Sequence, residues 1–563
     1  MASACRTIAV TTVAATVFSF HAALAQQAGD SVKRFGNSIV TAEPGAGSKY
    51  SAAPLKDSVR ASAKLQLHFS LSTRNFEELQ ARVARGERIS PTEMSEKYSG
   101  DAESATRLTR WLGQQGFSKI EASADRTSVY ATGTVAQIEK SLGVTMKSVT
   151  FDGETRPAAI TPPALPREVG DAVIAIDGLQ PWTHMLKHSI RPNNARTAFA
   201  SAHVEVRNAA AADTYKIYDI LKAYDAQGLE VAGKGRVTGK GQTIAILIDT
   251  LPLRSDVNEF WRRNSLPMNE SRVQFINVRG ANAELPPRDG EETLDTEWAS
   301  GIAPGANVRV YAAGSLEWVD IYRAMDRIYA DAQKPDGPRH LSLSFGARED
   351  FFTLDQLSEA MFLKLAAIGV STFVASGDAG SNPDETLSQN AGATESIVEY
   401  PASDRWVLAV GGTTLRYRPV GSLVVSETAW SGSGGGVSRK RAQPEWQKSV
   451  WTDKDNRLVP DVSSVADTPG AFIIYDGAEQ PIWGTSWSAP MWAGFSALIA
   501  EAREKQGKTP IGFLAPALYR LKPGAGFRDI VSGSNGAYKA GPGWDPVTGL
   551  GVPNVKGLID TLP

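Results

Sequence analysis

Hydrophobic and polar residues follow two different patterns along the chain, and the change between them divides it into two folded parts. Between residues 64 and 180, short alternating stretches and helical spacings predict a small α+β domain. The predicted elements of this part are strands at 65–71 and 128–134 and helices at 75–84, 91–114 and 134–142. Thr134 and Gln137 have the spacing of a capping box at the start of the last helix.

From residue 213 to residue 563, apolar strands alternate with amphipathic helices. The predicted strands are 243–249, 308–312, 341–345, 370–375 and 407–410, and the predicted helices are 256–263, a helix from Glu291, 318–332 and 354–367. Apolar strands between amphipathic helices indicate a parallel sheet that is covered on both faces. We therefore predict an α/β domain with its active site at the carboxyl ends of the strands.

Residues 1–25 have the features of a secretory signal peptide. One basic residue, Arg6, precedes an apolar run at 8–20, and Ala-Leu-Ala at 23–25 provides a small-x-small cleavage site. The run is too short for a membrane anchor. The signal peptide indicates a secreted protein, either extracellular or periplasmic. Because the only cysteine, Cys5, lies in this peptide, we expect the mature protein to have no disulfide.

Two further segments lack the periodicity of folded structure. Residues 26–63 begin with a polar stretch rich in Gly, Ala and Ser, so we predict a disordered lead-in. Residues 181–212 turn to Asn, Arg, Ser and Ala without a clear period, and we predict a linker that contains a processing site.

The composition excludes several kinds of partner. The chain has 563 residues, of which 42% are hydrophobic, and a formal net charge of −2. Without a basic excess or a Lys/Arg run, it is not expected to bind nucleic acid. No segment after the signal peptide is apolar for long enough to span a bilayer, so no membrane association is expected either.

Residues 484–490 (Gly-Thr-Ser-Trp-Ser-Ala-Pro) lead from a tight turn into an apolar helix. The glycine lets the backbone approach a bound substrate, and Pro490 falls in the first helical turn, where its missing N–H costs nothing. Ser486 would then lie at the positive end of the helix dipole, which suits a nucleophile. The alternative is that Thr485 and Ser486 only cap a buried helix.

A nucleophilic serine needs a base, and the histidines are poorly placed to provide one. Of the six, only His340 lies within the second domain, at the start of a strand, where we expect an exposed edge residue. A carboxylate pair is the other choice. Glu291 and Asp295 are four residues apart, so on a helix they share a face and can share a proton. Spacing alone leaves Glu292 as an alternative partner for Asp295.

Two glycine-containing turns are expected near the site. Asp378, in Ser-Gly-Asp at 376–378, follows an apolar strand and is either a turn residue or a protonated donor to the oxyanion of a tetrahedral intermediate. Residues 431–438 (Ser-Gly-Ser-Gly-Gly-Gly-Val-Ser) lack the Lys-Ser/Thr ending of a phosphate loop, so we place them at the border of a substrate cleft.

With these stretches identified, the chain resembles the sedolisin (serine-carboxyl peptidase) family, close to its kumamolisin-like members with a long propeptide. The resemblance rests on the motifs around Ser486, Glu291 with Asp295, and Asp378, which occur in the family's order. It extends from about residue 64 to the C-terminus. It also includes Ala-Val-Gly-Gly-Thr-Thr at 409–414.

The resemblance implies a subtilisin-like α/β catalytic domain in which Glu291 is the general base for Ser486. Asp295 would orient Glu291 and share its proton, and Asp378 would complete the oxyanion hole. The α+β domain at 64–180 would be a ferredoxin-like inhibitory propeptide, removed by cleavage in the linker. Such an enzyme hydrolyses polypeptides through an acyl-enzyme and is expected to be a monomer.

The resemblance also implies a calcium site near the C-terminus, with one ion per subunit. By correspondence with the family, the ligands are the side chains of Asp529 and Asp545 and the carbonyls of Ile530, Gly541 and Gly543. Oxygen ligands of this kind suit a hard cation. Without the resemblance, a Gly/Pro turn with two solvated aspartates is the simpler interpretation.

The sequence departs from the family at three positions. Phe345 stands where close relatives carry tryptophan, Ile248 stands where some carry a glutamate, with Asp249 one position away, and Trp483 replaces a small residue. Two other functions therefore stay open. One is a catalytically silent, calcium-stabilised secreted binding protein, and the other is a neutral subtilisin-like peptidase that uses His340.

Overall fold

The structure is a computed structural model in which the chain folds into two compact units, and each unit is described by itself below. The structure describes residues 31–40, 51–151, 153–181, 184–191, 214–351, 356–383, 396–418, 423–452 and 454–563. The first unit comprises residues up to 72 and 100–182, and the second comprises 73–99 and 183–563. The predicted signal peptide at 1–25 lies outside the described residues.

The first unit is built on an antiparallel sheet with helices, as the α+β prediction required. Its strand order is β4 (Ser118–Ala122), β5 (Ser128–Thr134), β3 (Lys64–Leu71) and β9 (Val173–Asp177). The helices α5 (Ala102–Gln114) and α6 (Val135–Leu142) bury apolar residues in the same core. The predicted capping box is confirmed, because the Gln137 backbone N–H donates to Thr134 Oγ1 and the Thr134 N–H donates to the Gln137 side chain.

The prediction of a disordered lead-in at 26–63 is wrong for the part that the structure describes. Strand β1 (Val32–Arg34) pairs with β8 (Ala164–Pro166), and strand β2 (Ser51–Pro54) pairs with β6 (Met146–Phe151). Phe35, Ile39 and Leu55 are buried in the core of the first unit. These isolated apolar anchors stand in a polar context, so the local pattern did not reveal them.

The predicted helix at 91–114 is interrupted. Helical turns end at Tyr98, and α5 begins only after Asp101, whose carboxylate caps it by accepting from the Ser104 N–H at 2.8 Å. Gly100 lies between them, where a Cβ would come within 2.0 Å of the Arg126 carbonyl oxygen. Residues 73–99, including α3 (Phe76–Ala84), belong with the second unit, where α3 packs against α12 (Gln356–Ala367). The prediction that residues 64–180 form one continuous domain is therefore wrong for residues 73–99.

The second unit contains the predicted parallel sheet. The strand order is β14 (Val273–Asn277), β15 (Asn307–Ala312), β13 (Thr243–Ile248), β16 (His340–Leu343), β18 (Ser371–Ala375), β20 (Leu408–Arg418) and β21 (Leu423–Ala429), and β24 (Val462–Val465) also pairs with β20. All these pairings are parallel except that of β20 with β21. A mostly parallel sheet of this kind is typical of apolar strands that are buried on both faces.

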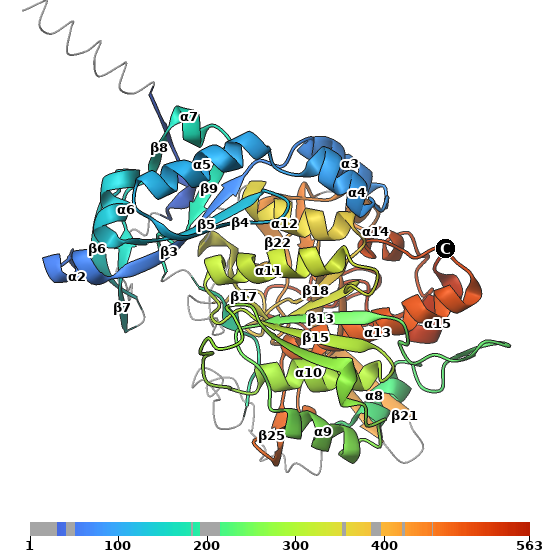
Figure 1. Cartoon of the computed structure of the whole chain (residues 1–563). Coiled ribbons are helices and arrows are strands. Elements are labelled where there is room, and N and C mark those ends of the chain that lie inside the picture. Colours follow the sequence, from blue (N-terminus) through green and yellow to red (C-terminus); the bar gives the residue numbers. More distant parts are fainter. Residues whose placement is uncertain are drawn as a thin grey trace, which may run out of the picture. The chain divides into compact units, whose positions relative to one another are not determined.

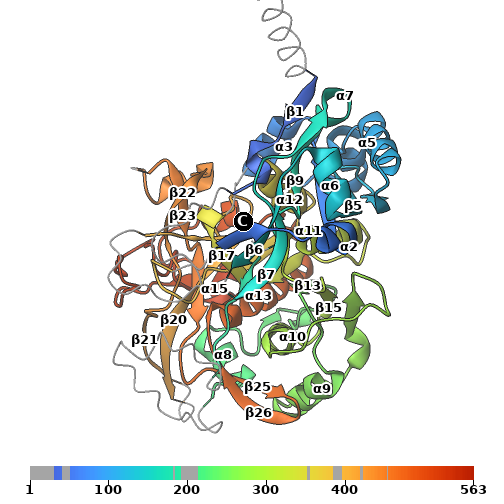
Figure 2. The same cartoon turned by 90° about the vertical axis from the view of Figure 1, so that its left-hand side faces the viewer.

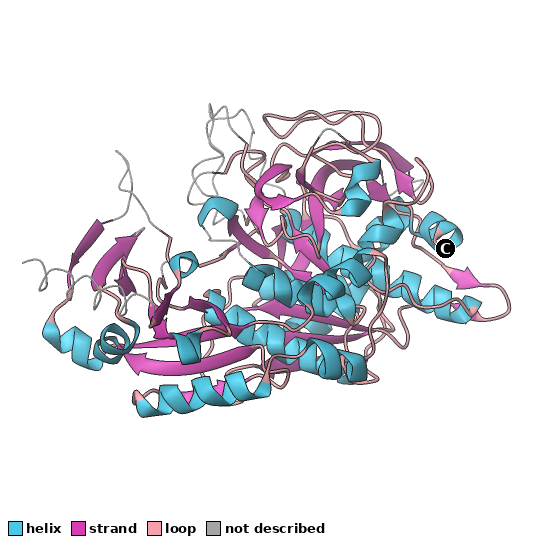
Figure 3. Cartoon of the chain, turned by 90° about the horizontal axis from the view of Figure 1, so that it is seen from above, coloured by secondary structure: helices cyan, strands magenta, loops and turns pink. Residues whose placement is uncertain are grey.

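Helices cover both faces of this sheet (Figure 1). Helices α10 (Glu291–Ile302) and α13 (Thr485–Gln506) pack together, and α11 (Trp318–Ala332) packs with α12. The hairpin of β25 (Ala471–Tyr475) and β26 (Ala478–Ile482) lies beside α9 (Arg254–Arg263) and α10 (Figure 2). Near the end of the chain, α15 (Val555–Thr561) packs against α13. The C-terminus that follows α15 is marked in Figure 3.

Most predicted elements of the second unit are confirmed within one or two residues at their ends, and the helix at 318–332 is α11. The predicted strand at 341–345 divides into β16 and the short β17 (Phe345–Arg348), with Ser344 at the break. The hairpins β20–β21 and β25–β26 were not predicted. Among the described residues, no helix combines the length and apolar character needed to cross a bilayer.

The close contact between α10 and α13 predicts that a larger residue at Gly494 destabilises the fold. A Cβ at Gly494 would lie 2.7 Å from Ile302 Cβ, because the two helices approach closely there. We expect Gly494→Val to lower the free energy of unfolding by about 1–3 kcal/mol, measured by thermal or denaturant unfolding. Gly507→Asn is the control, since Gly507 ends α13 with φ 75° and open space around it. Equal stability of the two variants would contradict the close packing.

Candidate active site

Ser486 lies in the first turn of α13, as predicted, and is fully buried. Gly484 precedes the helix with φ 131°, a conformation that favours glycine, and its N–H donates to the Ala466 carbonyl at 2.7 Å. The Ser486 hydroxyl donates a long hydrogen bond, 3.4 Å, to the Ser344 carbonyl. The other serine of the motif, Ser488, donates into the sheet, to the carbonyls of residues 464 and 465.

Glu291 and Asp295 lie in the first turns of α10, and both are fully buried. The Ser344 hydroxyl donates to Asp295 Oδ1 at 2.7 Å, so the break after β16 connects the acidic helix with the backbone next to Ser486. Neither carboxylate oxygen of Glu291 has a hydrogen-bond partner of good geometry among the described residues. The Ser486 and Ser189 hydroxyls nevertheless lie close enough to favour its ionised form.

Burial keeps protons on this pair. Burial, and then the negative charge of Asp295, raises the pKa of Glu291 well above its ordinary value. Burial also raises the pKa of Asp295, against the hydrogen bond from Ser344. The pair can therefore hold and exchange a proton well above the pH at which free carboxyl groups ionise.

Glu292, the alternative partner, points to a different neighbour. Its carboxylate accepts from the Gly290 N–H at 3.1 Å, more weakly from the Asp289 N–H, and from the Thr293 hydroxyl. It thus closes the turn that precedes α10. Burial raises the pKa of Glu292 to about 7.

Asp378 follows β18 and faces the start of α13. The Thr485 N–H and hydroxyl donate to Asp378 Oδ1 at 2.7 and 2.8 Å. The other oxygen, Oδ2, is buried and has no hydrogen-bond partner in the part of the chain that the structure describes. Burial raises the pKa of Asp378 to about 7, although a positive charge on His188 opposes the shift. Oδ2 is therefore a candidate proton donor beside Ser486.

The glycine-rich stretch at 431–438 packs against the turn that carries Asp378. The Gly434 N–H donates to the Gly377 carbonyl at 2.8 Å, and the Ser376 hydroxyl donates to the Gly434 carbonyl at 2.8 Å. A Cβ at Gly434 would come within 2.0 Å of the Ser376 carbonyl oxygen. The glycine is required by this close approach.

Part of the predicted linker runs through the site. Strand β10 (Leu186–Lys187) pairs antiparallel with β17, and the His188 N–H donates to the Ser344 carbonyl at 3.2 Å. Two residues further on, Ile190 and Trp483 exchange backbone hydrogen bonds of 2.8 and 3.1 Å. Residues 186–190 thus cross the site as an extended peptide would. No pattern in the sequence indicated this path, and residues 192–212 lie outside the described part of the chain.

Charged side chains of this segment find partners in the site. Lys187 Nζ lies 2.8 Å from Asp249 Oδ1 and 2.9 Å from Asp289 Oδ2. His188 Nε2 lies 3.1 Å from Glu399 Oε2, and both residues are buried. These ion pairs were not predicted, because they join stretches that are far apart in the chain.

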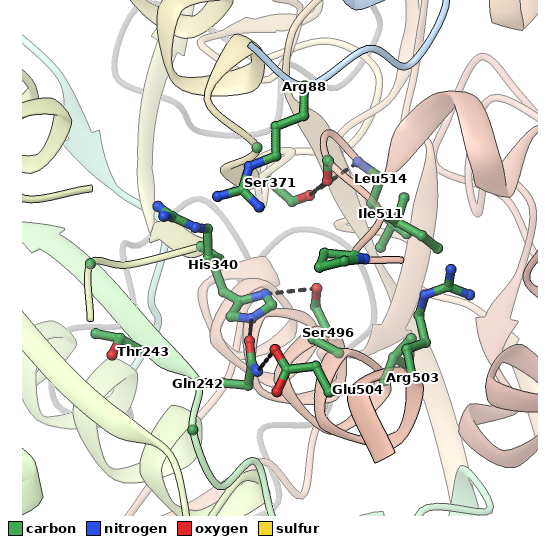
Figure 4. A pocket seen from close by; sticks show the side chains of 18 of the residues that line it. Arg88, Gln242, Thr243, His340, Ser371, Ser496, Arg503, Glu504, Ile511 and Leu514 are labelled. Atoms are coloured by element: carbon green, nitrogen blue, oxygen red, sulfur yellow. Dashed lines mark hydrogen bonds between the residues drawn. The ribbon is translucent and has the colours of Figure 1, made fainter. Parts of the chain in front are cut away.

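His340 lies in a different place. It is buried at the start of β16, so the prediction of an exposed edge residue is wrong. It lines a cavity of about 200 Å³ beside the second half of α13 (Figure 4). His340 Nε2 donates to Gln242 at 3.3 Å, because the Gln242 amide donates in turn to Glu504, while Ser496 donates to Nδ1 at 2.9 Å. Burial lowers the pKa of His340 to about 3, so it is neutral.

The predicted metal ligands meet in one turn. Asp529 Oδ2 accepts from the Gly543 N–H at 2.8 Å, and Asp545 Oδ2 accepts from the Gly541 N–H at 3.2 Å. The carbonyls of Ile530, Gly541 and Gly543 accept no hydrogen bond from the described residues. Within the described chain, no group of three or more His, Cys, Asp or Glu side chains could hold a metal. Carbonyl oxygens would thus have to complete any cation site here.

A buried serine at a helix N-terminus, a carboxyl pair that reaches it through Ser344, and a parallel sheet define a serine-type peptidase of the subtilase fold. Residues 288–514 match the subtilase family, and residues 52–181 match the activation domain of pro-kumamolisin. The chain belongs to the sedolisin family of serine-carboxyl peptidases and carries the activation domain of a proenzyme.

Named relatives agree with this assignment. The chain is 28% identical to kumamolisin from Bacillus sp. (strain MN-32), over 90% of this chain and 93% of that protein. It is 31% identical to tripeptidyl-peptidase 1 from Dictyostelium discoideum, over 66% of this chain and 62% of that protein. A solved structure of Pseudomonas sedolisin, complexed with two molecules of pseudo-iodotyrostatin, aligns with a TM-score of 0.54 and 27% identity, covering 62% of this chain and 97% of that chain.

The buried carboxyls predict that stability falls as the pH rises. Burial raises the pKa of both Glu292 and Asp378 to about 7, so the folded state holds protons that the unfolded state has released. Their stabilising contribution is complete below about pH 4 and is lost as the pH rises through about 7. We expect the melting temperature of a Ser486→Ala chain, which cannot use its candidate nucleophile, to fall between pH 5 and pH 8.

The variant Glu292→Gln isolates the contribution of Glu292 to this pH dependence of the melting temperature. A neutral amide does not titrate, so the decline in melting temperature over this pH range should become shallower. A melting temperature that rises with pH in both chains would contradict the assignment of raised pKa values.

Proposed function

We propose that this protein is a secreted, acid-active endopeptidase made as a proenzyme. In this proposal Ser486 is the nucleophile, Glu291 is its general base, Asp295 orients Glu291, and Asp378 stabilises the oxyanion. The observation that carries the proposal is the set of contacts at the start of α13. The Ser486 hydroxyl lies close to Glu291, Ser344 bonds both to Asp295 and to the Ser486 backbone, and Thr485 bonds to Asp378. Residues 1–25, as a signal peptide, would direct export.

The reaction follows from these positions. Ser486 Oγ attacks the carbonyl carbon of the bound peptide and passes its proton to Glu291. Asp378, protonated, donates from Oδ2 to the oxygen that becomes negative. Glu291 then gives the proton to the leaving amine, and the acyl-enzyme forms. Water, deprotonated by Glu291, hydrolyses it and restores the serine.

An acid working range follows from the need for a protonated Asp378. Because burial raises the pKa of this residue to about 7, it keeps its proton in mildly acidic solution and loses it as the solution becomes alkaline. Glu291 must at the same time accept a proton. The exchange of one proton between Glu291 and Asp295 allows the pair to act as a base in acid.

The linker segment supports a proenzyme. Residues 186–190 occupy the cleft through backbone pairing with β17 and with Trp483, so a substrate cannot take the same path. Cleavage within 181–212 would release the segment and the activation domain. The polypeptide in the cleft would thus be the domain's own chain until acid triggers processing.

Acidification of the purified precursor tests the catalytic assignment. We expect the wild-type chain to cut itself and then digest an unfolded protein, whereas Ser486→Ala and Glu291→Gln should each reduce the rate at least about 10⁴-fold. Electrophoresis and mass spectrometry of the products measure both steps. His340→Ala should retain activity, because His340 lies away from the other residues of the site.

Each alternative function has its own outcome in this experiment. Loss of activity in Ser486→Ala and His340→Ala but not in Glu291→Gln, with an optimum at neutral pH, would establish the histidine mechanism instead. An inert wild-type chain at every pH would favour the catalytically silent binding protein. Ser488→Ala is the matched control, because Ser488 lies in the same helical turn but donates into the sheet.

We further propose that the turn around Asp529 and Asp545 holds one calcium ion per subunit. The support is its oxygen donors: two carboxylates beside three carbonyls, those of Ile530, Gly541 and Gly543, that accept no hydrogen bond from the described residues. Such an ion would fix the C-terminal turns, since Asp545 also accepts from backbone N–H groups at 547 and 548.

Removal of calcium should destabilise the protein. A site filled at one hundred times its dissociation constant stabilises the fold by about 2.7 kcal/mol, so a chelator should lower the melting temperature and added calcium should restore it. Asp529→Asn should weaken this response, whereas Asp560→Asn, on the exposed end of α15, should not. An unchanged melting curve in chelator would remove the calcium proposal but leave the catalytic one intact.

A further inference from the structure

The path of residues 186–190 indicates how a peptide substrate would bind at the site. The His188 carbonyl oxygen and Asp378 Oδ2 both lie 2.2 Å from the position that a Cβ on Gly484 would occupy, so both oxygens crowd the same glycine. In the proposed mechanism, Asp378 bonds to the carbonyl oxygen of the residue before the cleaved bond. His188 therefore occupies the position of that residue.

The backbone hydrogen bonds agree with this register. On the amino side, the His188 N–H bonds to the Ser344 carbonyl, and Lys187 lies opposite Phe345 in β17. On the carboxyl side, Ile190 pairs with Trp483. Ser189, between them, lies close to Glu291. Lys187 therefore occupies the position of the second residue before the cleaved bond.

The side chains around Lys187 are acidic. Its ammonium group contacts the carboxylates of Asp249 and Asp289, and only 13% of the side-chain area of Lys187 and of Asp249 is exposed. Glu292 and Asp295 are also close enough to feel its charge. Burial lowers the pKa of Lys187, but the two aspartates outweigh this effect and hold it above its ordinary value.

When the linker is removed, Asp249 and Asp289 lose the ammonium group of Lys187. Asp249 follows the last residue of β13, and burial raises its pKa even against the positive charge of Lys187. Two neighbouring carboxylates without a counter-charge are costly in a partly dehydrated cleft. A substrate that brings a cation to the same position restores the lost ion pairs.

We propose that Asp249 and Asp289 form a cation-binding subsite that selects lysine or arginine as the second residue before the cleaved bond of a polypeptide substrate. This inference rests on the proposed peptidase function and specifies its substrate class. Polypeptides with a basic residue at this position are bound as Lys187 is bound. An acidic residue there is rejected, because it would face like charges.

A peptide series tests the subsite with processed wild-type enzyme. The peptides have the sequence Met-Leu-Xaa-His-Ser-Ile-Arg, which copies residues 185–191, and Xaa is lysine, arginine, norleucine or glutamate. We expect kcat/KM to be about tenfold or more higher for lysine and arginine than for norleucine, and lowest for glutamate. Mass spectrometry should place the cut between His and Ser.

Variants then assign the preference to the two aspartates. In Asp249→Asn combined with Asp289→Asn, the ratio of kcat/KM for the lysine peptide to that for the norleucine peptide should fall to near one. Asp476→Asn is the matched control, because Asp476 is an exposed aspartate that pairs with Arg288 instead. Its ratio should equal that of the wild type.

The outcomes separate this inference from the proposed function. Cleavage of all four peptides at equal rates would overturn the subsite while leaving the peptidase intact. A preference for lysine that survives in the double variant would also overturn the role of Asp249 and Asp289. Failure to cleave any peptide or an unfolded protein would overturn the peptidase function itself. If the double variant does not fold, the single variant Asp289→Asn, at a side chain that is 46% exposed, takes its place and should lower the same ratio.

Discussion

The burial of carboxyl groups around the start of α13 is the constraint on which the site depends. Glu291, Asp295 and Asp378 are all at least nine-tenths buried, and a low dielectric makes their ionised forms costly. Lys187 of the linker is close enough for its positive charge to lower the pKa of Asp295. While the linker is present, its charges partly compensate the carboxylates. In the proposed mechanism, protons replace these charges once the linker has been removed, which is why that mechanism works in acid.

Rigid packing keeps these carboxyls in place. Trp487, next to Ser486, contacts Trp298 of α10 edge to face with ring centroids 4.9 Å apart, and the Trp298 side-chain N–H donates to the Phe472 carbonyl. Gly494 lets the same two helices approach further along. The carboxyl pair and Ser486 therefore lie on two helices that pack together, and a shift of either helix would change the distance between Glu291 and Ser486.

The sequence predicted the elements with strong periodicity and the residues with a recognisable motif. Strand β13 and helix α11 were predicted because each has a regular pattern. Ser486, Glu291 and Asp378 were selected as candidates because their motifs occur in order. Burial of His340 and the path of Lys187 were not predictable. Both depend on partners distant in sequence: Gln242 and Ser496 surround His340, and β17 offers a free edge to β10. Local pattern carries no information about such partners.

Strand geometry explains why Ile248 and Asp249 differ in role although they are neighbours. Successive side chains of a strand point to opposite faces, so a shift by one residue moves a side chain from one face to the other. Ile248, the last residue of β13, is fully buried within the sheet, whereas Asp249 reaches Lys187 in the cleft. A carboxylate at 249 therefore does not replace one at 248 in a proton network. It adds negative charge beside Lys187. If the proposed subsite exists, this departure affects recognition of the substrate more directly than proton transfer.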